Sequence, residues 1–155
     1  MARHVTFVLG GARSGKSSFA QQLAQKAGSK ILYLATARVN DEEMERRVAR
    51  HRANRPAEWD TLETSSDLFQ GLKTKAIKYD AILLDCVTLL LGGMFHDLSE
   101  TAGEEELSQT ATVIMEDLMA ALENRPEPWI LVSNEVGQGI VPDNLMGRVF
   151  RDVQG

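Results

Sequence analysis

The stretch GGARSGKS, residues 10–17, restricts the possible folds of this chain more than any other feature. It matches G-x-x-x-x-G-K-[ST] at every fixed position and follows an apolar run, residues 5–9, that is typical of a buried strand. After it, apolar residues recur at helical spacing up to Ala27. A glycine-rich turn between a strand and a helix gathers backbone amides and the positive end of the helix dipole around an anion. The sequence therefore predicts a phosphate-binding loop (P-loop), with a chance glycine-rich turn as the alternative.

Two side chains of this loop and one carboxylate elsewhere would complete a nucleotide site. In loops of this pattern the lysine, here Lys16, reaches the β- and γ-phosphates, and the next hydroxyl, Ser17, binds Mg²⁺. A second oxygen ligand for Mg²⁺ is expected at the end of a neighbouring strand. Asp85, which ends the run AILLD, is the candidate, although it could instead cap the following helix; Asp60 and Glu63 are weaker candidates. These residues predict binding of a nucleoside triphosphate with Mg²⁺.

Strand-like and helix-like segments alternate along the chain. The expected strands are residues 5–9, 31–36, 59–64, 81–85 and 129–132, and the expected helices are 16–27, 41–53, 65–76, 104–124 and from 145 onward. The apolar segment 87–95 is interrupted by Gly92-Gly93, where we expect a break. The alternation predicts an α/β, P-loop NTPase-like domain over residues 1–155, with a mostly parallel sheet and helices on both faces. The final helical pattern still continues at Gly155, so we expect the sequence to lack its C-terminal end.

Composition and charge exclude several classes of protein. The net charge is −5, whereas general nucleic-acid binding needs a basic surface. No apolar stretch approaches the roughly 20 residues that span a bilayer, and the N-terminus has no signal-peptide pattern. The lone cysteine, Cys86, leaves no internal disulfide framework and fits a reducing compartment. We therefore expect a cytoplasmic protein with no membrane span and no nucleic-acid partner.

An arginine-rich segment surrounds one histidine. Met44, Val48 and His51 fall at helical spacing on one face, and five arginines lie within ten residues in an otherwise acidic chain. Guanidinium groups bind phosphate oxygens bidentately, so the cluster suits a polyphosphate. His51 is then a candidate nucleophile toward phosphorus. A solvated charged helix with a structural histidine is the alternative; His4 and His96 lack comparable surroundings and are expected to be structural.

Five segments occur in the order seen in one family. They are GGARSGKS (10–17), LATA (34–37), ARHRANRPAEW (49–59), LLDCVTL (83–89) and VSNEVGQGIVP (132–142). Together they resemble the bifunctional adenosylcobinamide kinase/adenosylcobinamide-phosphate guanylyltransferase family of cobalamin biosynthesis. The resemblance implies two reactions: a nucleoside triphosphate phosphorylates adenosylcobinamide, and His51 then takes GMP from GTP and passes it to the new phosphate, which gives adenosylcobinamide-GDP.

The resemblance also implies the site residues. His51 and Lys16 would be catalytic, Ser17 and Asp85 would hold Mg²⁺, and ATP and GTP would be co-substrates, although the sequence leaves open which one feeds the kinase step. The residues implied in nucleotide binding are Gly10, Gly11, Ala12, Arg13, Ser14, Gly15, Lys16, Ser17, Ala35, Thr36, Ala37, Arg52, Ala53, Asn54, Arg55, Glu63 and Asp85. The roles of Asn134 and Glu135 stay open.

The family further implies a homotrimer and a chain that continues past Gly155 with another strand. The apolar segment 87–95 is compatible with a subunit interface, although Gly92-Gly93 stands where the family often has a polar asparagine. Two other functions remain possible from the residues alone. One is a small-molecule P-loop kinase with a structural His51, and the other is a GTP-binding switch module.

Overall fold

Five short apolar segments pair in parallel into one sheet. In the computed structural model, which describes residues 4–38, 41–63, 68–137 and 139–155, the strands are β1 (Val5–Gly10), β2 (Ile31–Ala35), β3 (Asp60–Glu63), β4 (Ala81–Asp85) and β5 (Trp129–Asn134). Their order across the sheet is β1-β5-β4-β2-β3, and every described pairing is parallel. β2, β4 and β5 occupy the interior of the sheet and are almost wholly buried, which explains their uninterrupted apolar sequences.

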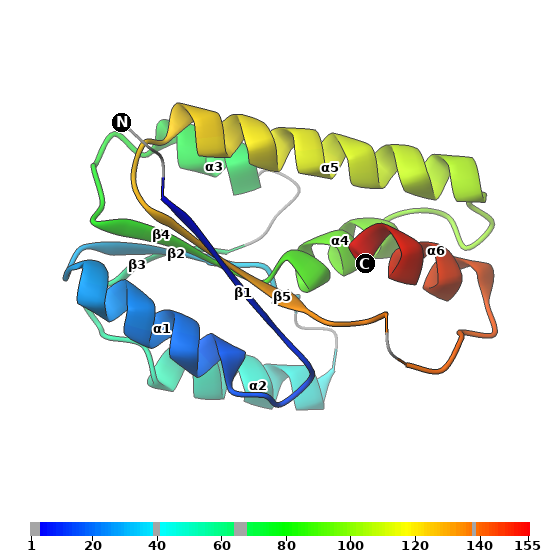
Figure 1. Cartoon of the computed structure of the whole chain (residues 1–155), viewed down its shortest axis with the longest axis horizontal. Coiled ribbons are helices and arrows are strands. Elements are labelled where there is room, and N and C mark those ends of the chain that lie inside the picture. Colours follow the sequence, from blue (N-terminus) through cyan, green and yellow to red (C-terminus); the bar gives the residue numbers. More distant parts are fainter. Residues whose placement is uncertain (1–3, 39–40, 64–67, 138) are drawn as a thin grey trace.

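Helices cover both faces of this sheet, as the alternation of segments predicted (Figure 1). On one side lie α1 (Lys16–Ala27) and α2 (Glu42–Ala53). On the other side lie α3 (Leu68–Thr74) and α5 (Glu104–Asn124), and α4 (Val87–His96) and α6 (Leu145–Gln154) lie toward one end of the sheet. Ala20 and Ala24 of α1 pack on the first face, and Leu107 of α5 packs with α3, α4 and α6 on the second. The predicted α/β class is therefore confirmed. Among the described residues, no helix is long and apolar enough to cross a membrane.

The segment 87–95 differs from its prediction. It forms one continuous helix, α4, across Gly92-Gly93, and Val87, Leu90, Leu91 and Phe95 are buried in the core. Gly93 serves close packing rather than a break, because a Cβ at this position would lie 2.8 Å from Nε of Arg38. The apolar side chains of Val87, Leu90, Leu91 and Phe95 therefore contribute to the core of the chain, and a role of this segment in a subunit interface stays a prediction. The predicted helix 65–76 begins outside the described residues, and its described part is α3.

The parallel register brings residues that are distant in sequence to one edge of the sheet. Gly10 of β1 is level with Asn134 of β5, and Ala35 of β2 is level with both Glu63 of β3 and Asp85 of β4. All five residues end their strands. In open α/β sheets, ligands bind at the carboxyl ends of the strands. This edge is therefore the place to look for a functional site.

A buried ion pair anchors the connection between α5 and β5. The Arg125 guanidinium donates to Oε1 of Glu127 at 2.6 Å and to the carbonyl oxygens of Lys75 and Ile77. Glu127 is only 4% exposed and also accepts from the backbone N–H of Tyr79. The pair thus ties the start of β5 to the turn that precedes β4.

We expect Glu127→Ala to lower the free energy of unfolding by about 3 kcal/mol, because Arg125 would keep its charge in a mostly buried place without the carboxylate that balances it. Urea denaturation measures this loss. Glu123→Ala, which removes an exposed glutamate near the end of α5, is the control and should change stability by at most about 0.5 kcal/mol. A loss below about 1 kcal/mol for the Glu127 variant would mean that water solvates Arg125 in the pair's absence.

Candidate functional site

The loop between β1 and α1 has the backbone of an anion cradle. Arg13 and Gly15 both adopt positive φ, 58° and 81°, so the chain turns sharply before the helix. Gly15 is the N-cap of α1 and has no side chain to cover the first amides of the helix, which lack intrahelical acceptors. A Cβ on Gly10 would lie 2.6 Å from Oγ of Ser14, so a larger residue at this position would displace that hydroxyl. This geometry suits a phosphate group.

The ammonium group of Lys16 lies over the loop. Its Nζ donates to the carbonyl oxygen of Gly11 at 2.9 Å, and the side chain is half-buried. The cation is therefore held where a bound phosphate would need it. A lysine is a flexible point charge, so it can exchange this carbonyl for phosphate oxygens when a nucleotide binds.

Asp85 meets the loop from the neighbouring strand. Its Oδ1 accepts from Oγ of Ser17 at 3.3 Å, and its Oδ2 accepts from the hydroxyl of Tyr33 at 2.8 Å. The cap of α4 is Cys86 instead, whose Sγ accepts from the N–H of Leu89. The alternative that Asp85 caps this helix is therefore wrong.

The two oxygens of Ser17 and Asp85 fit a magnesium ion. Neighbouring ligands of an octahedral Mg²⁺ lie about 3 Å apart, close to the 3.3 Å between Oγ of Ser17 and Oδ1 of Asp85. Magnesium in such sites takes one or two protein oxygens, and phosphates and waters supply the rest. Across the described ranges no group of three or more His, Cys, Asp or Glu side chains is arranged to hold a metal ion.

Tyr33 has a tightly defined environment. Its ring is 4% exposed, its centroid lies 4.1 Å from Cζ of Arg55, and it stacks with Trp59 at 6.5 Å between ring centroids. Burial, together with the negative charge of Asp85, raises the pKa of Tyr33 well above its usual value. Burial also lowers the pKa of Arg55. The phenol is therefore a hydrogen-bond donor at every physiological pH.

Helix α2 carries the arginine-rich face. Asp41 caps it, accepting from the N–H of Met44 at 2.7 Å, and three glutamates in the first turn and basic residues in the last turn complement the helix dipole. Met44, Val48 and His51 line one cavity, as their spacing predicted. Arg46 does not line it and pairs with Glu42 along the exposed surface.

One cavity of about 390 Å³ joins the loop, the carboxylate and the histidine. Its lining residues are Lys16, Ser17, Tyr33, Ala35, Ala37, Arg38, Met44, Arg47, Val48, His51, Arg52, Arg55, Glu63, Asp85, Cys86, Leu89 and Asn134. Four residues of the loop, Gly10, Ser14, Gly15 and Lys16, line a shallower groove along β1. Lys16 belongs to both, so the groove and the cavity meet at this lysine.

Some residues expected in the site do not line this cavity. Thr36 is 1% exposed, and its hydroxyl bonds the backbone N–H and carbonyl of Cys86, so it supports the end of β4. Ala53 and Asn54 end α2 on the surface and do not line the cavity. Gly11, Ala12 and Arg13 are exposed in the loop and do not line it either. Arg52 does line it, where it forms an ion pair with Glu63.

Among the cavity residues without a counterpart in the sequence candidates are Tyr33 and Arg38. Tyr33 could have been found, because it lies two residues before Ala35 and alternate residues of a strand share a face. Arg38 binds Asp97 through two hydrogen bonds of 2.6 and 3.0 Å, and this guanidinium lowers the pKa of Asp97. Arg38 thus lines the cavity while bound to the residue that ends α4. The sequence around Arg38 has no pattern that predicts this contact.

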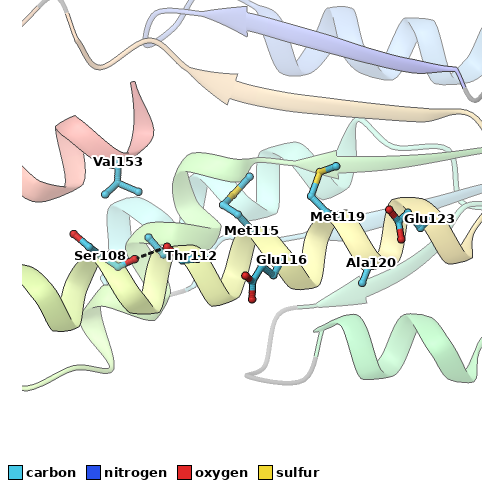
Figure 2. Close-up of a pocket in the computed structure, with 9 residues that line it drawn as sticks. Ser108, Thr112, Met115, Glu116, Met119, Ala120, Glu123 and Val153 are labelled. Carbon is cyan, nitrogen blue, oxygen red and sulfur yellow. Dashed lines mark hydrogen bonds between the residues drawn. The ribbon is translucent and has the colours of Figure 1, made fainter.

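A larger hollow of about 610 Å³ lies along α5, away from the strand ends (Figure 2). Its walls are Ser108, Ala111, Thr112, Met115, Glu116, Met119, Ala120, Glu123 and, from α6, Val153. This lining has two glutamates and no lysine, arginine or histidine. Because a nucleotide needs positive groups around its phosphates, the smaller cavity at the strand ends is the candidate site.

Comparisons with known proteins identify relatives of this chain. The model of the family described as cobinamide kinase / cobinamide phosphate guanyltransferase matches residues 6–155. The bifunctional adenosylcobalamin biosynthesis protein CobP of Pseudomonas aeruginosa is 41% identical over 150 residues, which cover 96% of this chain and 81% of the relative. The corresponding CobU proteins of Salmonella typhimurium and Escherichia coli are 39% and 36% identical, each covering 96% of this chain and 84% of the relative.

A structural comparison supports the fold. The crystal structure of the RadB recombinase superposes on 97% of this chain and 71% of its own chain, with a TM-score of 0.54 and 16% sequence identity. At that identity, the likeness concerns the α/β fold alone.

Proposed function

Because the chain belongs to the cobinamide kinase / cobinamide phosphate guanyltransferase family, we propose that it phosphorylates adenosylcobinamide and then converts the product to adenosylcobinamide-GDP. The observation that carries the proposal is the shared cavity, which holds Lys16 of the phosphate loop and His51 of the arginine-rich helix. One nucleotide site could then serve a phosphoryl transfer and a guanylyl transfer.

In the kinase step, the hydroxyl oxygen of adenosylcobinamide attacks the γ-phosphorus of ATP or GTP. The bond from that phosphorus to the β–γ bridging oxygen breaks, the nucleoside diphosphate leaves, and the hydroxyl proton passes to solvent. Lys16 and the loop amides bind the phosphates and stabilise the charge that develops on them. Ser17 and Asp85 would hold Mg²⁺, which would supply positive charge to offset the negative charge of the phosphates.

In the guanylyl step, an imidazole nitrogen of His51 attacks the α-phosphorus of GTP. A P–N bond forms, the P–O bond to pyrophosphate breaks, and the histidine carries GMP. A phosphate oxygen of adenosylcobinamide phosphate then attacks the same phosphorus, and the P–N bond breaks to free His51. Arg47, Arg52 and Arg55 line the same cavity and can bind the phosphates, and Glu63 beside Arg52 is proposed to contact the guanine nucleotide.

The assembly and location of the protein are also proposals. We propose a cytoplasmic homotrimer of single-domain subunits, on the family resemblance and on the reducing compartment that the lone, buried Cys86 fits. The partners are then adenosylcobinamide and nucleotides, with no nucleic acid. Light scattering on a size-exclusion column measures the subunit number directly.

The test of the proposed function is a covalent adduct. Intact-protein mass spectrometry after incubation with GTP and Mg²⁺ should show one added guanylyl group that acid removes and that mild base leaves in place, as a phosphoramidate requires. Peptide mapping should place it on the peptide that holds His51, and addition of adenosylcobinamide phosphate should discharge it. No adduct, together with cobinamide phosphorylation, would favour the small-molecule kinase; nucleotide binding without either reaction would favour the switch module.

A further inference from the structure

Both oxygens of the Asp85 carboxylate are bonded, and they are bonded by different elements. Ser17 at the start of α1 donates to Oδ1, and Tyr33 of β2 donates to Oδ2 with the shorter distance, 2.8 Å against 3.3 Å. β2 and β4 are neighbouring strands in which Ala35 is level with Asp85, so Tyr33 reaches the carboxylate from the adjacent strand. The phenol is therefore placed to fix the orientation of the carboxylate plane.

That orientation matters for metal binding. The terminal torsion of an aspartate is broad, so a carboxylate held at one oxygen alone samples many orientations. Mg²⁺ requires near-ideal octahedral geometry, and partners that orient a metal ligand typically change metal affinity by 10–100-fold when they are removed. A hydrogen bond on Oδ2 leaves Oδ1, the oxygen beside Ser17, as the one that faces the loop.

The ring of Tyr33 is itself held in place. It is 4% exposed, the guanidinium of Arg55 lies over it with Cζ 4.1 Å from its centroid, and it stacks with the indole of Trp59 at 6.5 Å between ring centroids. Arg55 follows His51 by four residues and lines the same cavity. Tyr33 thus contacts two parts of the cavity. Its hydroxyl bonds Asp85, the proposed magnesium ligand, and its ring contacts Arg55, which lies near His51 in the sequence.

We propose that Tyr33 is a positioning residue with two functions. Its hydroxyl orients Asp85 for the binding of Mg²⁺ with a nucleoside triphosphate, and its ring holds Arg55 for the transfer step at His51. The proposal rests on the proposed function for the identity of the nucleotide and of the transfer step. It adds a residue that acts through Asp85 and Arg55, the two side chains it contacts.

Removal of the hydroxyl tests the first function. We expect Tyr33→Phe to weaken Mn²⁺ binding in the presence of a non-hydrolysable GTP analogue by about 10-fold, measured by electron paramagnetic resonance of the free ion. Binding of the analogue without metal should be unchanged. The matched control is Tyr79→Phe, because Tyr79 is 3% exposed, donates to Asp60 at 2.6 Å and has Arg125 over its ring, but lies outside the cavity.

The metal affinities of the two variants decide whether the Tyr33 hydroxyl orients Asp85. A shift of less than two-fold for the Tyr33 variant, or an equal shift for the Tyr79 variant, would overturn the proposal. Failure of the proposed function looks different, because the wild-type protein would then form no guanylyl adduct while the difference in metal affinity between the two variants remained.

Removal of the ring tests the second function. Tyr33→Phe keeps a ring beneath Arg55, so saturating Mg²⁺ should restore its guanylylation rate to that of the wild type. Tyr33→Leu removes the hydroxyl and the ring together. At saturating Mg²⁺ its guanylylation rate should therefore stay at least about 10-fold below that of the wild type, because kcat is lowered and more metal cannot restore it. Equal recovery of both variants would show that the ring does not position Arg55.

Discussion

Replacing Lys16 by alanine is expected to lower the rates of kinase and guanylyl transfer together, each by about 10³-fold, which is about 4 kcal/mol of transition-state stabilisation. The reason is that Nζ lies over the phosphate loop, where it bonds the Gly11 carbonyl, and that the same lysine lines the cavity of His51. If one loop binds the triphosphate in both reactions, one substitution must impair both. Steady-state assays of each step, with saturating cobinamide substrates, measure the two losses.

Two variants sharpen this result. Lys26→Ala removes an exposed lysine in the last turn of the same helix and should leave both rates unchanged. Lys16→Arg keeps the charge but replaces a compact ammonium by a planar fork, so it should restore little activity. Thermal unfolding should show the same Tm for all three variants, because Lys16 makes only one half-exposed hydrogen bond to the loop. An unaffected guanylyl transfer in Lys16→Ala would mean a second nucleotide site.

The sheet and its functional edge followed from local sequence signals. The predicted strands 5–9 and 81–85 and the predicted helices 16–27 and 104–124 match β1, β4, α1 and α5 to within a residue. Buried parallel strands carry uninterrupted apolar runs and helices carry apolar stripes, and both signals depend only on neighbouring residues. Since all strands are parallel, their last residues meet at one edge, and this placed Asp85 beside the loop.

The parts that failed depend on contacts between distant residues. Gly92-Gly93 would break an exposed helix, but α4 is packed among the sheet, α5 and α6, and this burial outweighs the low helix propensity of glycine. Arg38 enters the cavity because Gly93 leaves room for it and Asp97 binds it. No local pattern encodes a contact of this kind. The same holds for the stacking of Arg55 on Tyr33.

His51 is where the two proposed reactions should separate. We expect His51→Ala to abolish the guanylyl adduct and to lower guanylyl transfer by at least about 10³-fold, because no other group would attack the α-phosphorus. The kinase rate should stay within about three-fold of the wild type, since the phosphate loop, Ser17 and Asp85 do not depend on the imidazole. The two products can be followed in one reaction by chromatography of the corrinoids.

The control for this variant is His96→Ala, which removes an exposed histidine at the end of α4 that does not line the cavity. Free imidazole provides a second check. The cavity gains room where His51 is truncated, so added imidazole should restore part of the guanylyl transfer in His51→Ala and should do nothing in Lys16→Ala. Rescue of this kind separates a nucleophile from a residue that only supports the fold. Loss of both reactions in a folded His51 variant, without rescue, would mean that the histidine shapes the site for both steps instead of attacking phosphorus.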